Sequence, residues 1–317
     1  MFKRLRREQN PREVAHDQQL TTLICERDNL KRRCDELSAV IEDLGFPPGH
    51  FYSPVVDTRD PHVIGAVRTR TSQGHGVTVD TEQILENLHT FARHQRCFPF
   101  SSSNQGGHRF HLNNTFFGPH DSLALFSILL EYKPKRVVEV GSGFSSALFL
   151  DTDELFLDAQ MQLTFIDPSL EQLRSLIRSD ETQRVQMIEQ KVQDVPFQVF
   201  DALESGDILF IDSSHVSKTA SDVNHYLFEV LPRLSAGVMV HIHDIFYPFE
   251  YPEDWVLNQK RSWNEAYLVR AFLQYNTAFR MIYWSSFASR MLTEHVCELM
   301  PLAAGDEGGS LWLRKVL

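Results

Sequence analysis

The sequence has few cysteines, and their spacing excludes the cysteine-rich metal folds. Its four cysteines are Cys25, Cys34, Cys97 and Cys297, and no pair is spaced as CxxC or as a zinc knuckle. Disulfide-stapled secreted domains are shorter and carry denser, paired cysteines. We therefore expect free thiols and a cytoplasmic protein.

Long apolar runs are also missing. The longest, near residues 123–130, is far shorter than the roughly 18 residues that a membrane span needs. The N-terminal stretch MFKRLRREQNPR is basic, but no hydrophobic segment follows it, so it does not resemble a secretory signal. We expect no transmembrane segment.

Positive charge is scarce as well. The formal net charge is −11 at pH 7, and beyond the first residues lysine and arginine form no long patch. Affinity for nucleic acids depends on neutralising phosphates, so we expect no nucleic-acid partner. With 317 residues, 42% of them hydrophobic, the chain can form one large domain with an appendage.

Residues 12–44 contain no glycine and carry apolar residues with a seven-residue step. The d positions are Leu23, Leu30, Leu37 and Leu44, and the a positions are Leu20, Arg27, Cys34 and Ile41. This stripe predicts a coiled-coil helix over residues 1–45, with self-association through residues 12–45. The alternative is a single amphipathic helix that lies on its own domain.

Two prolines and two glycines within residues 45–49 cannot continue this helix. Residues 46–80 are rich in Pro, Gly and Asp, and we expect an ordered linker or lid segment there. From residue 81 short apolar runs alternate with helical patterns. The expected strands are 136–140, 163–167, 185–188, 207–212 and 238–243, and the expected helices are 81–93, 120–132, 170–178 and 221–231.

This alternation predicts an α/β domain over residues 81–317, with a doubly wound, Rossmann-like parallel sheet. Ligands of such sheets bind at the carboxyl ends of the strands. The first strand ends in Glu139-Val-Gly141-Ser142-Gly143, and the second ends in Asp167. Glycines at a strand-to-helix turn admit a ligand to the backbone, and an acid at the second strand can accept ribose hydroxyls.

The pattern E-x-G-x-G with an acid ending the second strand resembles the class I S-adenosylmethionine-dependent methyltransferases. The resemblance implies that Gly141, Ser142 and Gly143 pass under the methionine part of the cofactor. It also implies that Glu139 supports that site and that Asp167 holds the ribose. Asp194 is placed at the adenine by the same analogy, although it could instead cap a turn.

Polar residues also end the next two strands. Asp212 and His215 follow the fourth strand, and His243-Asp244 end the fifth. Two carboxylates and an imidazole are reasonable ligands for Mg²⁺ or Mn²⁺, so we expect a metal at Asp212, His243 and Asp244. Asp212 would also border the cofactor, and His215 would remain free as the catalytic base. The alternative is that these side chains only cap strand ends.

This arrangement is similar to the metal-dependent O-methyltransferases, although His243 departs from the Asp-Asn pair of the catechol type. It is closer to the metal-dependent sugar O-methyltransferase and cephalosporin hydroxylase-like group, which also has Asp-x-x-His after the fourth strand. The resemblance implies an O-methyltransferase with a small-molecule or glycan acceptor. The aromatic residues 246–255 would form a lid or acceptor wall, or simply a packed loop.

Other functions remain open at this point. A hydroxylase-like enzyme could use the same metal-binding edge without methyl transfer. A nicotinamide dehydrogenase is disfavoured because Ser146 stands where the dinucleotide fingerprint has its third glycine. A non-catalytic scaffold that works through its coiled coil is the alternative from a different class.

Overall fold

The computed structural model describes residues 11–43, 45–70, 74–102, 107–178 and 184–317. The chain divides into two compact units, Met1–Val63 and Ile64–Leu317. The first unit contains the long helix α1 (Pro11–Asp43), which confirms the expected N-terminal helix. Leu44, the last expected d position, lies outside the described residues.

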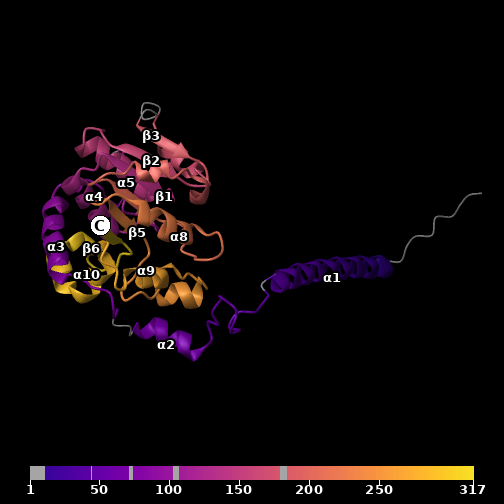
Figure 1. Cartoon of the computed structure of the whole chain (residues 1–317). Helices are drawn as coiled ribbons and strands as arrows, with labels where there is room; N and C mark the ends of the chain where they lie inside the picture. Colours follow the sequence, from indigo (N-terminus) through magenta and orange to yellow (C-terminus); the bar gives the residue numbers. More distant parts are fainter. Residues whose placement is uncertain (1–10, 44, 71–73, 103–106, 179–183) are drawn as a thin grey trace, which may run out of the picture. The chain divides into compact units, whose positions relative to one another are not determined.

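The second unit is built on a mixed sheet, which has seven strands within the described residues. Its order is β3-β2-β1-β4-β5-β7-β6, and Figure 1 labels β3, β2, β1, β5 and β6 of this sheet. The strands are β1 (Arg136–Val140), β2 (Gln162–Ile166), β3 (Val185–Ile188), β4 (Ile208–Ile211), β5 (Met239–Ile242), β6 (Phe279–Trp284) and β7 (Leu311–Lys315). The first five strands run parallel, and β7 pairs antiparallel with both β5 and β6.

Helices and short turns connect the strands. The α-helices after α1 are α2 (Pro61–Thr69), α3 (Thr81–Gln95), α4 (Pro119–Tyr132), α5 (Phe144–Phe156), α6 (Glu171–Leu176), α7 (Gln198–Asp201), α8 (Asp222–His225), α9 (Glu265–Leu273), α10 (Ser285–Met291) and α11 (Thr293–Leu299). Two π-helical turns, Tyr226–Val230 and Asp254–Asn258, and 3-10 turns at Val192–Asp194, Leu231–Arg233 and Pro301–Ala303 complete the described elements. The α/β fold expected from the alternating pattern is confirmed.

The central strands are short and apolar because they are covered on both faces. Every residue of β4, Ile-Leu-Phe-Ile, is buried, and so is every residue of β5, including His241. A strand with one solvated face would alternate apolar and polar residues instead. His241 stacks on the Phe210 ring at 3.8 Å, and its Nε2 lies 2.9 Å from the Ser310 hydroxyl. It is a core histidine whose Nδ1 has no hydrogen-bond partner among the described residues.

The strand order reverses between β1 and β4, because the chain proceeds outward to β2 and β3 before it returns to β4. Such a switch point leaves a crevice at the carboxyl ends of the strands. The turns that follow β1, β4 and β5 therefore meet at one edge of the sheet. No helix among the described residues is long and apolar enough to cross a membrane.

Candidate functional site

The turn after β1 is shaped by contact with the end of β4. Gly141 has a positive φ of 87°, and a Cβ added to it would lie 1.7 Å from the backbone oxygen of Asp212. Only glycine fits such a close approach. Gly143 differs, because a Cβ there would meet no atom within 4 Å. Protein packing therefore does not require glycine at 143, which is the N-cap of α5 and leaves open space at this turn.

Glu139 lies beneath this turn and is fully buried. The hydroxyls of Ser145 and Ser146 each donate a hydrogen bond to its carboxylate at 2.5 Å. Burial raises the pKa of Glu139 to about 8, although the serine hydrogen bonds act in the opposite direction. Glu139 thus fixes the first turn of α5 through these two serines.

Asp167 follows β2 and links the turn after β2 to the glycine turn after β1. Its carboxylate accepts a hydrogen bond from the Ser142 backbone N–H at 2.9 Å and another from the Ser169 N–H at 2.7 Å. Asp167 therefore caps the turn that follows β2 and also holds the backbone of the glycine turn. It borders a cavity of about 400 Å³ together with Gly141, Lys191, Gln193, Asp212 and Lys218.

Asp194, expected at the adenine, lies outside the cavity that its neighbour Gln193 borders. It ends the 3-10 turn Val192–Asp194 as an exposed residue and does not border the 400 Å³ cavity. Gln193 borders it instead, with its amide nitrogen held 2.8 Å from the Ala220 carbonyl oxygen. The sequence could not distinguish these neighbours, because a single 3-10 turn decides which of them faces the cavity.

The ends of β4 and β5 bring three of the expected side chains together. Ligand atoms of Asp212, His215 and Asp244 all lie within 4.8 Å of one another. The Nε2 of His215 is 3.4 Å from Asp212 Oδ1 and 3.5 Å from Asp244 Oδ2. Asp244 and His215 both have positive φ values, 58° and 59°, which turn the chain sharply at this edge.

The other ring nitrogen of His215 contacts Glu265, a residue that the sequence reading missed. Nδ1 lies 2.7 Å from Glu265 Oε2, and because a carboxylate only accepts, Nδ1 carries the hydrogen. Glu265 is fully buried at the start of α9, and the Tyr226 hydroxyl donates to its second oxygen. The ring of Trp263 covers His215, with 4.3 Å between the ring centroids.

Burial alone would lower the pKa of His215, but the charges of Glu265, Asp212 and Asp244 outweigh it and hold the pKa well above its ordinary value. At Asp212 the neighbouring imidazoles similarly overcome the effect of burial and lower the carboxyl pKa. At Asp244 burial prevails, and its pKa is raised. The cluster therefore favours a positive charge among its carboxylates.

His243 lies at the side of this cluster. Its Nε2 is 3.6 Å from Asp244 Oδ1, its ring packs on Phe117, and its Nδ1 has no hydrogen-bond partner among the described residues. His215, which was expected as the base, supplies the imidazole closest to both aspartates. Buried Asp121, also missed from the sequence, borders the same space and accepts backbone hydrogen bonds from Gly309 and Ser310.

A second cavity, of about 960 Å³, opens beside the cluster. Its lining includes Asp212, His215, His243, Asp244, Phe246, Trp255, Arg261 and Trp263. The aromatic segment after β5 was expected to form a lid, an acceptor wall or a packed loop. Phe246 and Trp255 from this segment line the cavity. Asp212 and Ser213 border both cavities.

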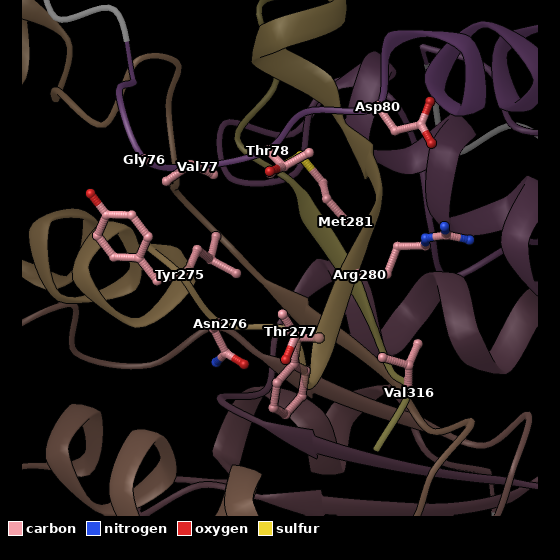
Figure 2. A pocket seen from close by; sticks show the side chains of 12 residues that line it. Gly76, Val77, Thr78, Asp80, Tyr275, Asn276, Thr277, Arg280, Met281 and Val316 are labelled. Carbon is pink, nitrogen blue, oxygen red and sulfur yellow. The ribbon is translucent and has the colours of Figure 1, made fainter.

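Another cavity, of about 800 Å³, lies beside the edge strand β6. Figure 2 shows Thr78, Asp80, Asn276, Thr277 and Arg280 around it. Among the described residues that line it, Asp80 is the single carboxylate, and none is a histidine or cysteine. It also lies away from the switch point, so we place the chemical site at the ends of β4 and β5.

Comparisons with known proteins identify the type of domain. The family described as a methyltransferase domain matches residues 138–245, which run from β1 to just beyond β5. An uncharacterized protein of Archaeoglobus fulgidus is 31% identical over 184 residues, which cover 55% of this chain and 82% of that protein.

Solved structures give weaker likenesses. CmcI with Mg and SAM is 20% identical, covers 63% of this chain and 73% of that chain, and has a TM-score of 0.38. The O-methyltransferase TomG from Streptomyces achromogenes, in complex with SAM, is 16% identical, covers 76% and 91%, and has a TM-score of 0.40. Likenesses of this size carry no argument about activity. On its matched domain, its sheet and its glycine turn, the chain belongs to the class I S-adenosylmethionine-dependent methyltransferases.

Proposed function

We propose that the chain is a metal-assisted O-methyltransferase that acts on a hydroxyl of a sugar or sugar-containing small molecule. The observation that supports this most is the convergence of Asp212, His215 and Asp244 where the two cavities meet. The cavity beside the glycine turn would take the methyl donor, and the larger one the acceptor. The preference for a sugar rests on the Asp-x-x-His resemblance alone.

The residues present fit a divalent cation such as Mg²⁺ or Mn²⁺. Two carboxylates and an imidazole offer their ligand atoms within one small volume. The Nδ1 of His215 is held by the buried carboxylate of Glu265, which is the usual second partner of a metal-bound histidine. When bound, the cation would lower the pKa of the acceptor hydroxyl and orient its oxygen.

We propose His215 as the third ligand beside Asp212 and Asp244. Its Nε2 faces both carboxylates, whereas Asp244 is the one carboxylate of the cluster within 4 Å of His243 Nε2. The role of His215 as the general base is a second proposal, and Glu265 would orient the ring for that role too. In either role, holding both substrates in line supplies much of the rate.

We also propose that α1 mediates self-association. The apolar residues of its heptad stripe are exposed, including Leu23, Leu30 and Leu37 at 55%, 63% and 60%. At the flanking positions, Glu26 of one helix and Lys31 of a parallel, in-register copy have complementary charges. A second copy of α1 would therefore cover the stripe.

Calorimetric titration with S-adenosylhomocysteine, in Mg²⁺, in Mn²⁺ and with chelator, tests the donor site. We expect micromolar binding, about 8 kcal/mol. No binding under any condition would refute the methyl-donor proposal and favour a hydroxylase-like or scaffold function.

The metal proposal needs a separate variant. Asp244 borders only the larger cavity, so Asp244→Asn should abolish methyl transfer and metal binding while donor binding is retained. Unchanged metal binding in Asp244→Asn would contradict the proposed ligand set.

A further inference from the structure

Arg261 borders the larger cavity and is fixed by two indole rings. Its guanidinium carbon lies 4.2 Å from the centroid of the Trp255 ring and 4.4 Å from that of Trp263. The two indoles meet at an interplanar angle of 80°, so the guanidinium sits in the corner between them. Its backbone N–H donates to the Trp255 carbonyl oxygen at 2.9 Å, which ties the corner together.

This contact leaves the guanidinium without an ion pair among the described residues, although its charge contributes, after the Asn258 and Gln259 hydrogen bonds, to lowering the pKa of exposed Asp254. Within the described part of the chain, no ion pair joins Arg261 to a carboxylate. Arg70 and Arg233 differ, because they pair with Glu307 at 2.5 Å and Asp201 at 2.7 Å. Cation–π contacts occupy the faces of a guanidinium, whereas its N–H groups lie in the plane and bind oxyanions in pairs.

Arg261 is also close to the reaction centre. The ring of Trp263 contacts both the guanidinium and the His215 ring. One indole thus links the proposed metal-binding cluster to this cation. Among the described lining residues Arg261 is the sole lysine or arginine, while Asp121, Asp306 and Glu307 add negative charge.

We propose that Arg261 binds an oxyanion, a carboxylate or a phosphate, on the acceptor. The inference rests on the proposed function, because it assigns the chemical class of that acceptor. An anionic molecule would be repelled by the acidic lining unless a fixed cation met it. Arg261 supplies that cation in the planar form that matches carboxylate and phosphate oxygens.

The test is calorimetric binding to the full chain saturated with Mg²⁺ and S-adenosylhomocysteine. The probes are matched sets of neutral hexose, uronic acid and hexose 6-phosphate in the gluco, galacto and manno series. The variants are Arg261→Gln and Arg261→Lys, with Arg233→Gln as control. Arg233 makes a cation–π contact with Phe197 but borders neither of the two cavities.

We expect an acidic probe to bind wild type about 10- to 100-fold more tightly than its neutral partner. Arg261→Gln should lose that preference, Arg261→Lys should keep part of it, and Arg233→Gln should keep all of it. The uronic acid and phosphate arms identify which oxyanion is bound. If Arg261 had only a structural role, Arg261→Gln would weaken the binding of neutral and acidic probes equally.

Equal binding of neutral and acidic probes, a preference that survives Arg261→Gln, or no binding of any acidic probe would each overturn the inference. A preference that depends on Arg261 supports it even without a methylated product. The absence of a methylated product would count against the proposed methyl transfer and would leave the inference about Arg261 intact.

Discussion

The sharpest test of the cluster is the substitution Glu265→Gln. Glu265 is fully buried, and its two oxygens contact His215 Nδ1 and the Tyr226 hydroxyl. Glutamine keeps the size of the side chain and one acceptor oxygen but removes the negative charge. The imidazole of His215 then loses the partner that makes it a stronger metal ligand.

The size of the effect follows from this contact. Burial lowers the pKa of His215, and Glu265 contributes the largest of the opposing charges. Loss of such an outer carboxylate typically reduces metal affinity about 10- to 100-fold. At about 1.4 kcal/mol per factor of ten, this corresponds to roughly 1.4 to 2.7 kcal/mol of metal-binding free energy.

The assay is calorimetric titration of Mn²⁺ into protein saturated with S-adenosylhomocysteine. Glu250→Gln is the matched control, because Glu250 also accepts a tyrosine hydrogen bond, from Tyr267, but contacts no histidine. Tyr226→Phe keeps the contact between Glu265 and His215 and should cause a smaller loss. Circular dichroism of each variant checks that the fold is retained.

Two outcomes would refute the reasoning in different ways. If folded Glu265→Gln binds Mn²⁺ as wild type does and loses only turnover, His215 is the general base and not a ligand. If neither metal binding nor turnover changes, the contact between His215 and Glu265 has no part in the chemistry.

Three further predictions concern the glycine turn, the acid beneath it and the N-terminal helix. Gly141→Ala places a Cβ 1.7 Å from a backbone oxygen and should lower the melting temperature or prevent folding, whereas Gly143→Ala, with nothing within 4 Å, should melt like wild type and bind S-adenosylhomocysteine about tenfold less tightly. Equal melting temperatures for the two variants would contradict this account. Because the pKa of Glu139 is raised from 4.5 to about 8, the protonated acid stabilises the fold fully at low pH, and that stability is lost as pH rises through about 8. Glu139→Gln, which mimics the neutral acid, should gain melting temperature relative to wild type between about pH 5 and about pH 9, and a constant difference would show that no such shift exists. In a parallel pair of α1 helices Cys34 faces its own copy and Cys25 points outward, so mild oxidation should cross-link wild type and Cys25→Ser but not Cys34→Ser. Cross-linking through Cys25 instead would exclude that register.

The first five strands could be predicted from the sequence because each is a short apolar run bounded by polar residues. The predicted 136–140 and 185–188 match β1 and β3, and the other three differ by one residue at each end. The last two strands were not identified. β6 is interrupted by a register shift between Met281 and Tyr283, and β7 follows a loop of small residues, so neither gives a clean pattern.

The candidate cluster was partly predictable because topology alone brings the ends of β4 and β5 together. Asp212 and Asp244 follow directly from that adjacency. The adjacency of the strands does not decide between His215 and His243. That choice depends on backbone turns with positive φ, which no periodicity in the sequence encodes. Asp121 and Glu265 come from α4 and α9, which the fold brings to the cluster from distant parts of the chain. Their only local signal is an acid in the first turn of a helix, and capping explains that equally well.

The proposed transfer belongs at Asp212, because Asp212 and Ser213 are shared by the donor cavity and the acceptor cavity. The backbone of Asp212 is fixed on β1, where its N–H donates to the Val140 carbonyl oxygen at 2.8 Å. Its own carbonyl oxygen fills the space that a Cβ of Gly141 would need. A shift of the glycine turn would therefore move the proposed donor site and the Asp212 carboxylate together. For an in-line reaction, which tolerates little misplacement, this contact would hold the two proposed substrates in a fixed relation.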